Sequence, residues 1–318
     1  MSLCLLCGLF SFLSSKSSTQ SKGTYSGKPW RSLKGFNLEA AHVEFSPDGK
    51  WLAGAGQNQI WRTVKTNGKV RKLQDSAYST KVWDAATWKL IKTLPLKDSG
   101  DIAFSSDGKW LAVLSQMRVT IHQTTDWKII AGVGVPTSKN GLGLLTDIQF
   151  SPQDDVLAIG SHLISTTTWL PLRQVTTTSD VNSVAFSNDG KTLVTGGWDG
   201  VVQVWDWITG KELSRLQHAK ASTKVQISPD GKLLATACFN HSAAKLWDIS
   251  TGQAVQSFKG GSDSLTPLGI VTMGVDAIAF SPDKKSFVTE SGDAMRIWDI
   301  KSGQIFHTFH GVSGRLSA

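Results

Sequence analysis

Short apolar runs alternate with polar turns along the chain, and one such pattern occurs six times. It reads VEFSPDGKWLA from Val43 and returns as IAFSSDGKWLA, IQFSPQDDVLA, VAFSNDGKTLV, VQISPDGKLLA and IAFSPDKKSFV, starting at Ile102, Ile148, Val184, Val225 and Ile278. In the first copy an alternating run leads into Ser-Pro-Asp-Gly, where Pro fixes φ and Gly accepts a positive φ. An extended apolar run then resumes at Trp51. Each copy therefore predicts an antiparallel hairpin.

A second hairpin follows the first in several units. The copies recur every 47 residues on average, measured from Phe45 to Phe280. Further strand–turn–strand patterns are VVQVWDWITGKELSRL, KLWDISTGQAVQSF and RIWDIKSGQIFHTF, starting at Val201, Lys245 and Arg296. Four antiparallel strands in a unit of this length are typical of a propeller blade.

These units resemble the WD-repeat (Trp-Asp) β-propeller family over roughly residues 29–311. The name-giving dipeptide stands as Trp83-Asp84, Trp205-Asp206, Trp247-Asp248 and Trp298-Asp299, whereas two units carry Ile121-His122 and Leu163-Ile164-Ser165 instead. The resemblance implies an all-β propeller of four-stranded antiparallel blades. We expect six blades, with an incomplete seven-bladed ring as the alternative.

The resemblance also implies structural roles for several polar and aromatic residues. In the family, a His, a Ser or Thr, an Asp and the Trp often share hydrogen bonds inside a blade. The residues that match these positions here are Asp199, Trp205, His218, Thr236, Trp247 and Trp298. The network is fragmentary, because His241 stands where the Asp is expected and Thr177 where a His is expected.

Two segments leave the closure of the ring open. Residues 30–35 resemble an outer strand, but residues 303–309 read the same way at the other end of the repeats, which leaves one strand surplus. In addition, the sequence QIWRTVKTNGKVRKLQ around Trp61 gives the first unit one hairpin too many. This hairpin is either an insertion that projects from the blade or the remnant of a lost repeat.

We expect residues 29–318 to form one propeller domain, preceded by a flexible or signal-like tail at residues 1–28. The apolar run at 3–13 is too short to span a bilayer, and no Lys or Arg precedes it. Cys4, Cys7 and Cys238 are the three cysteines, so no disulfide can form within the repeats. This favours a cytoplasmic protein, with an exported or periplasmic one as the alternative if the run is a signal peptide. No second Cys pair follows Cys4 and Cys7, so we expect no metal site.

Loop lengths indicate where a partner binds. The long segments 54–80, 132–145 and 259–275 fall in second connections or between blades, which a four-stranded meander places at one end of the propeller. We expect the partner-binding residues at that end to be Trp198, Phe239, Asn240 and His241 on hairpin tips, and Arg62, Lys65, Lys69, Arg71 and Lys72 on the extra hairpin. The alternatives are that Trp198 packs on its neighbouring blade and that the basic hairpin is simply solvated.

Charge and motifs narrow the function. The net charge of +8 favours an acidic protein partner, and no known nucleic-acid-binding module is recognisable. The His residues match no catalytic or cofactor motif, so we expect neither catalytic residues nor a cofactor. The sequence thus predicts a monomeric, non-catalytic scaffold for protein–protein interaction. The alternatives are a basic propeller associated with nucleic acid and a hydrolase or lactonase with a site in the central channel. For the latter, the inner strands offer His42, Glu44, Asp101, Asp147, Gln149 and Gln226.

Overall fold

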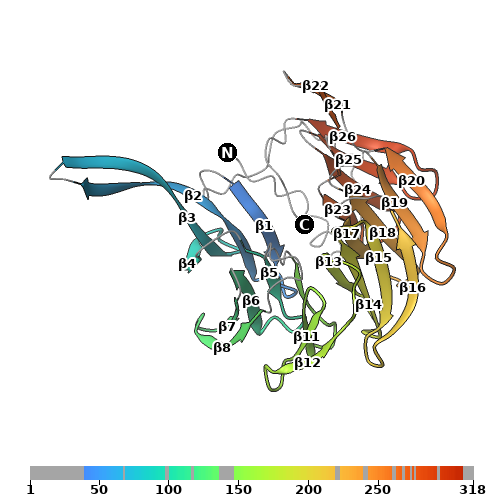
Figure 1. Ribbon diagram of the computed structural model, residues 1–318, viewed down its shortest axis with the longest axis horizontal. Helices are drawn as coiled ribbons and strands as arrows, with labels where there is room; N and C mark the ends of the chain where they lie inside the picture. The colour runs from blue at the N-terminus through green and yellow to red at the C-terminus, as the bar shows by residue number, and fades with distance from the viewer. Residues whose placement is uncertain are drawn as a thin grey trace.

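Six four-stranded antiparallel sheets surround a common centre in the computed structural model (Figure 1). The structure describes residues 39–66, 69–96, 100–115, 118–135, 147–218, 223–238, 243–259, 263–266, 269–272, 274–275, 277–291 and 294–310. The expected six-bladed propeller is therefore confirmed. The predicted tail and residues 30–35 lie outside the described residues. Within those residues, no helix is long and apolar enough to cross a membrane.

Each blade is a meander of four consecutive strands that runs from the centre outwards. Blade 1 contains β1 (Glu39–Phe45), β2 (Trp51–Thr66), β3 (Lys69–Asp84) and β4 (Leu90–Leu96); blade 2 contains β5 (Ile102–Phe104), β6 (Trp110–Ser115), β7 (Arg118–Gln123) and β8 (Ile129–Gly134). Blade 3 contains β9 (Ile148–Phe150), β10 (Val156–Ile159), β11 (His162–Ser165) and β12 (Pro171–Gln174); blade 4 contains β13 (Val181–Phe186), β14 (Thr192–Gly197), β15 (Val201–Asp206) and β16 (Lys211–Gln217). Blade 5 contains β17 (Thr223–Ile227), β18 (Leu233–Cys238), β19 (Ala243–Asp248) and β20 (Ala254–Lys259); blade 6 contains β23 (Ala277–Phe280), β24 (Ser286–Ser291), β25 (Ala294–Asp299) and β26 (Ile305–His310).

The recurring Ser-x-Asp-Gly sequence forms the turn between the first two strands of a blade. In blade 1 the Ser46 hydroxyl donates to Asp48 Oδ1 over 2.7 Å and accepts from the Trp51 N–H over 2.9 Å. Gly49 has a φ of 69°, a value that glycine adopts without steric cost. Because the sequence itself supplies these bonds, the turn is set locally in each repeat.

Aromatic packing explains an unexpected feature of the turns between the third and fourth strands. Blades 4, 5 and 6 place a glycine at the positive-φ position: Gly210, Gly252 and Gly303. Blades 1, 2 and 3 place a tryptophan there, with φ between 56° and 62°: Trp88, Trp127 and Trp169. Such a backbone costs about 1–3 kcal/mol for a bulky residue. Two of these indoles gain a contact across a blade junction: Trp127 lies 5.5 Å from Trp51, and Trp169 lies 5.4 Å from Trp110, both edge to face. Aromatic pairing of this kind offsets part of the strain.

Clusters of buried apolar side chains join consecutive blades. Between blades 1 and 2, for example, Ala53, Val82 and Leu94 pack against Phe104 and Leu111. Corresponding clusters join blades 2 and 3, 3 and 4, 4 and 5, and 5 and 6. Each blade thus buries one face against each neighbour, as repeat architectures require.

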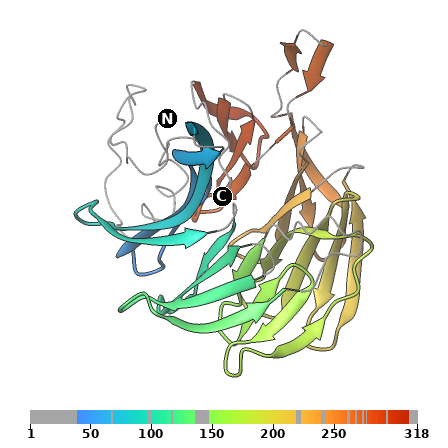
Figure 2. The same ribbon diagram turned by 60° about the vertical axis from the view of Figure 1, so that its left-hand side comes forward.

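The extra hairpin of the first unit is an extension of blade 1. Strands β2 and β3 pair continuously from Trp51 opposite Asp84 to Thr66 opposite Lys69, so Trp61 lies in the same hairpin as the Trp83-Asp84 dipeptide. In Figure 1 this hairpin reaches far beyond the other blades. Of the two alternatives, the projecting insertion is therefore the observed one. A further hairpin, β21 (Asp263–Thr266) with β22 (Gly269–Thr272), stands in the link between blades 5 and 6, apart from the blades (Figure 2).

Inside the blades, Trp indoles donate to threonine hydroxyls. Trp205 Nε1 donates to Thr195 Oγ1 over 3.0 Å and Trp298 Nε1 to Thr289 Oγ1 over 2.9 Å. In blade 5, Thr236 Oγ1 accepts from Trp247 Nε1 over 2.8 Å and also lies 2.8 Å from His218 Nδ1. The hydroxyl of Thr236 therefore joins two buried rings.

Replacing Thr236 with valine removes this bridge at nearly constant volume. We expect Thr236→Val to lower the free energy of unfolding by about 3 kcal/mol, because two buried polar rings each lose a bond. Thr289→Val is the matched control and removes the bond to Trp298, so its cost is about 1.5 kcal/mol. Urea unfolding measures both values. Equal losses in the two variants would contradict a bridging role for Thr236.

Candidate functional site

The turn between β14 and β15 presents an aromatic side chain at the end of the propeller where the blade-to-blade links lie. The Trp198 side chain is 42% exposed, and the backbone N–H of Trp198 donates to the Asp180 carbonyl over 3.0 Å. Asp199 Oδ1 accepts from the Val201 N–H over 3.1 Å, and Gly200 has a φ of 79°. The indole is thus held on a turn that hydrogen bonds fix on both sides, and Asp199 stabilises that turn.

The other expected partner-binding residues are only partly described. Phe239, Asn240 and His241 lie outside the described residues, between β18 and β19. The basic residues of the long hairpin are placed by the backbone pairing of β2 with β3, in which Arg62 is opposite Leu73 and Lys65 is opposite Val70. Lys72 is exposed. The structure therefore brings this hairpin and the Trp198 turn to the same end, because both connect the second and third strands of a blade.

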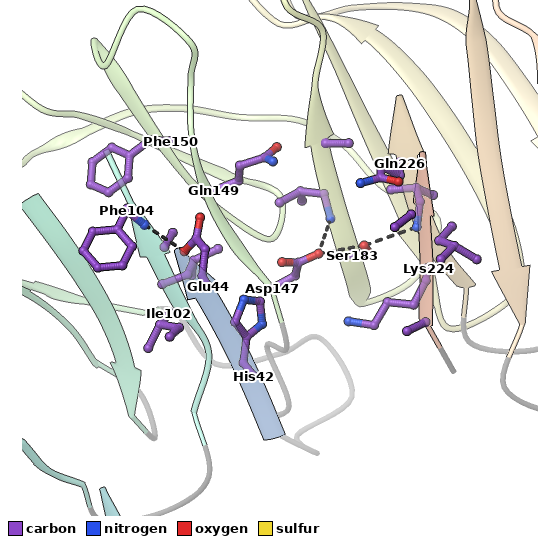
Figure 3. Close-up of a pocket in the computed structure, with 18 of the residues that line it drawn as sticks. His42, Glu44, Ile102, Phe104, Asp147, Gln149, Phe150, Ser183, Lys224 and Gln226 are labelled. Carbon is purple, nitrogen blue, oxygen red and sulfur yellow. Dashed lines mark hydrogen bonds between the residues drawn. The ribbon is translucent and has the colours of Figure 1, made fainter. Parts of the chain in front are cut away.

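The centre of the propeller is a polar cavity of about 590 Å³ (Figure 3). Two layers of side chains, from equivalent positions in or just before the inner strands, surround it, and all of them except Asp101 line the cavity. The layer nearer the blade-to-blade links contains His42, Asp101, Asp147, Ser183, Lys224 and Ala277, and the next layer contains Glu44, Ala103, Gln149, Ala185, Gln226 and Ala279. Each layer takes one residue from each blade.

The second layer alternates long polar side chains with alanines. Glu44 Oε2 accepts from the Phe104 N–H over 2.9 Å, Gln149 Oε1 from the Phe186 N–H over 2.8 Å, and Gln226 Oε1 from the Phe280 N–H over 2.9 Å. Each polar side chain thus reaches the first strand of the next blade, where the small alanine leaves room. The long side chains join blades 1 to 2, 3 to 4 and 5 to 6.

Hydrogen bonds in the first layer connect blades 1 to 2, 2 to 3 and 3 to 4. His42 Nδ1 lies 2.6 Å from Asp101 Oδ1, and Asp101 Oδ2 accepts from the Ile148 N–H over 2.8 Å. Asp147 Oδ2 accepts from the Val184 N–H over 2.9 Å and from Ser183 Oγ over 2.6 Å. These bonds run from blade 1 to blade 4, so the carboxylates of the channel bind backbone and side-chain donors of neighbouring blades.

Burial and mutual charge shift the acid–base behaviour of this cluster. Burial raises the pKa of Glu44 to about 7 and that of Asp147 to about 6, although the charges of His42 and Lys224 respectively oppose these shifts. Burial alone would lower the pKa of His42, but the charge and hydrogen bond of Asp101 outweigh it and raise that pKa to about 9. The same ion pair outweighs burial for Asp101 and lowers its pKa.

The cluster can stabilise junctions, but it does not form a metal site. Across the described ranges, no group of three or more His, Cys, Asp and Glu residues is placed to hold a metal ion. The alternation of Glu44, Gln149 and Gln226 with alanines is visible in the repeat sequences VEF, IAF, IQF, VAF, VQI and IAF. Sequence reasoning treated these residues as possible channel ligands and missed their role as acceptors for the next blade.

Similarity to known proteins agrees with the fold. A family model described as "WD domain, G-beta repeat" matches residues 170–206, which contain β12 to β15. Together with the fold, this match supports a WD-repeat family for the chain. This WD-repeat chain is 26% identical over 235 residues to WD repeat-containing protein 1 of Bos taurus, and 26% identical over 236 residues to the protein of that name from Gallus gallus. Each match covers 70% of this chain and 36% of the relative.

A second relative is named as part of an assembly. The Target of rapamycin complex subunit LST8 of Saccharomyces cerevisiae is 32% identical over 117 residues, which are 36% of this chain and 35% of the relative. The WD-repeat chain thus spans about a third of the length of the curated relatives that it matches.

The channel cluster makes stability depend on pH. Three groups have a higher pKa in the folded chain than in the unfolded chain. The pKa rises from 4.5 to about 7 for Glu44, from 3.8 to about 6 for Asp147 and from 6.5 to about 9 for His42. At this cluster the folded state therefore binds more protons across this window, and the cluster's contribution to the free energy of unfolding falls as the pH rises from about 5 to 9. Burial lowers the pKa of His122 and His162, so these two histidines act in the opposite direction. Urea unfolding at several pH values measures this, and a rise over the same range would contradict it.

The variant Glu44→Gln isolates the contribution of the Glu44 carboxylate to this pH dependence. Glutamine still accepts from the Phe104 N–H, as Gln149 and Gln226 do in their blades, but carries no buried charge. We expect this variant to gain about 2 kcal/mol at pH 8 relative to the unmodified chain and to change little at pH 5. The reverse change, Gln149→Glu, is the control and should lose stability at pH 8.

Proposed function

We propose that this WD-repeat chain is a non-catalytic scaffold that binds a protein partner at the end of the propeller where the long connections lie. Trp198 carries the proposal, because its indole is 42% exposed on a turn that two hydrogen bonds fix. A large aromatic side chain on a rigid support is typical of an interface anchor. Little conformational entropy is lost when such a side chain binds.

The chemistry of the partner follows from charge. The chain carries 33 Lys and Arg against 25 Asp and Glu, and Lys72 on the long hairpin of blade 1 is exposed at the same end as Trp198. An acidic protein surface would be attracted to this end. The complex-subunit name of one relative supports an assembly role. We propose a monomeric propeller in the cytoplasm, where a reduced, buried Cys238 is stable.

The channel supports a structural role more than a catalytic one. A propeller enzyme needs carboxylates or imidazoles that face a substrate, and the structure does bring His42, Glu44 and Asp147 to the cavity (Figure 3). Asp101 lies beside them, 2.6 Å from His42. However, each of the three carboxylates accepts from a backbone N–H of the neighbouring blade. Their hydrogen bonds therefore serve the fold, and we assign them no catalytic step.

Trp198→Ala tests the proposed surface. We expect this variant to lose most of the binding to partners that co-purify with the unmodified chain, by tenfold or more in affinity, because an aromatic anchor contributes about 2 kcal/mol or more. Quantitative affinity purification, followed by titration of the recovered partner, measures the loss. Binding should also weaken as salt rises if the partner is acidic.

Ile208→Ala is the matched control. Ile208 belongs to the same blade and is 57% exposed, but it lies on the turn between β15 and β16, at the opposite end of the propeller. We expect this variant to bind as the unmodified chain does. The proposed surface would be wrong if Trp198→Ala recovered as much partner as the unmodified chain, or if Ile208→Ala lost as much partner binding as Trp198→Ala.

A further inference from the structure

The wall of the central cavity carries hydrogen-bond donors that the blade junctions leave unused. Gln149 and Gln226 each accept from the neighbouring blade through Oε1, and no acceptor in the described part of the chain binds their Nε2 groups. Lys224 lies two residues before Gln226 on β17, and its Nζ makes no hydrogen bond or ion pair with a described residue. Three donors therefore face the cavity without a partner from the described blades.

Two carboxylates in the same wall each have one oxygen to spare. Glu44 binds the Phe104 N–H through Oε2, and Asp147 binds the Val184 N–H and the Ser183 hydroxyl through Oδ2. Across the described ranges, nothing donates to Glu44 Oε1 or to Asp147 Oδ1. The cavity thus offers acceptors as well as donors.

His42 adds a further donor on the blade 1 side. Its Nδ1 lies 2.6 Å from Asp101 Oδ1. Burial alone would lower the pKa of His42, but Asp101 raises it to about 9, so both ring nitrogens carry a hydrogen at neutral pH. Within the described residues, the Nε2 hydrogen has no acceptor.

The junction bonds fix the direction of several of these groups. One atom of each terminal amide or carboxylate of Glu44, Gln149 and Gln226 is bound to a backbone N–H, which sets the position of the other atom. Figure 3 shows Lys224 and Gln226 extending toward the side of the cavity on which His42, Glu44 and Gln149 lie. Groups that are held in place before binding lose little conformational entropy when a ligand arrives.

The size and polarity of the cavity point to one class of ligand. Its volume of about 590 Å³ lies within the range of about 300–1,000 Å³ that is typical of small-molecule sites. A hydroxyl group both donates and accepts, so a ligand with several hydroxyls can pair with amide, ammonium and carboxylate groups at once. An apolar ligand would leave these polar groups unpaired and desolvated, which is unfavourable.

The charges around the cavity favour a neutral ligand. The positive charge of His42 is paired with Asp101. Burial raises the pKa of Asp147 and the charge of Lys224 opposes this shift, so these two groups compensate each other. Burial raises the pKa of Glu44 to about 7, which leaves this carboxyl partly protonated at neutral pH. No large charge of one sign therefore remains to attract an ion.

We propose that the central cavity binds a neutral polyhydroxylated small molecule, such as a hexose or a cyclic polyol. Gln149 Nε2, Gln226 Nε2 and Lys224 Nζ donate to oxygens of its hydroxyl groups. Glu44 Oε1 and Asp147 Oδ1 accept from those groups. The alanines that alternate with the polar side chains offer methyl groups to the C–H groups of its ring. The site is separate from the proposed partner surface, so either proposal can fail without the other.

Titration with neutral polyols tests the proposal directly. The full chain is titrated with a panel of common neutral hexoses and with myo-inositol, and binding is followed by saturation-transfer NMR. Glucose 6-phosphate and cyclohexanol are the charged and the apolar comparison probes. We expect at least one neutral polyol to bind at millimolar concentration, glucose 6-phosphate to bind more weakly than glucose, and cyclohexanol not to bind. No binding of any neutral polyol, or tighter binding of either comparison probe, would overturn the proposal.

Two variants locate the site with the polyol that binds best. Lys224→Met removes a charged donor, and we expect the dissociation constant to rise about tenfold. Glu44→Gln keeps the bond to the Phe104 N–H but replaces the spare acceptor with a donor. We expect it to weaken polyol binding at pH 8, where it also stabilises the fold. A variant that is more stable and yet binds less excludes misfolding as the cause.

Lys232→Met is the matched control. Lys232 belongs to the same blade as Lys224, but it is exposed on the turn between β17 and β18 and does not line the cavity. We expect its dissociation constant to equal that of the unmodified chain. Unchanged binding in both Lys224→Met and Glu44→Gln, or an equal loss in Lys232→Met, would refute the site.

Discussion

Burial between neighbouring blades is the interaction on which this structure depends. A four-stranded blade has two apolar faces and cannot bury either by itself, so it is stable only between neighbours. Small residues such as Ala53 and Ala235 on one face receive larger residues such as Leu111 and Phe287 from the next blade. The ring is therefore stabilised junction by junction.

The polar channel is a consequence of the same requirement. Inner strands of adjacent blades leave backbone N–H groups at the junctions, and Glu44, Gln149, Gln226, Asp101 and Asp147 accept from them. Where the acceptor is a carboxylate, burial raises its pKa unless an ion pair compensates, as His42 does for Asp101. Glutamine makes the same bond without the charge. The channel therefore contains two kinds of acceptor, carboxylates whose charge depends on pH and amides that stay neutral.

A rigid ring with variable connections separates stability from recognition. The turns between the first two strands are short and internally hydrogen-bonded, so that end of the propeller varies little from blade to blade. The opposite end carries the long β2–β3 hairpin, the β21–β22 hairpin and the exposed Trp198. Additions at this end leave the blade junctions intact, which is why recognition can be located there.

The sequence by itself determined the blades, because a repeat of about 47 residues with Ser-x-Asp and Trp-Asp signals is local information. It also placed Trp198 on an exposed turn. It did not determine whether the hairpin at Trp61 was an insertion, since only the register of β2 with β3 decides that. Nor did it reveal the positive φ of Trp127 and Trp169, whose strain is offset by tryptophans of the preceding blade. The bonds of the channel likewise depend on residues far apart in sequence, so only the tertiary structure could decide them.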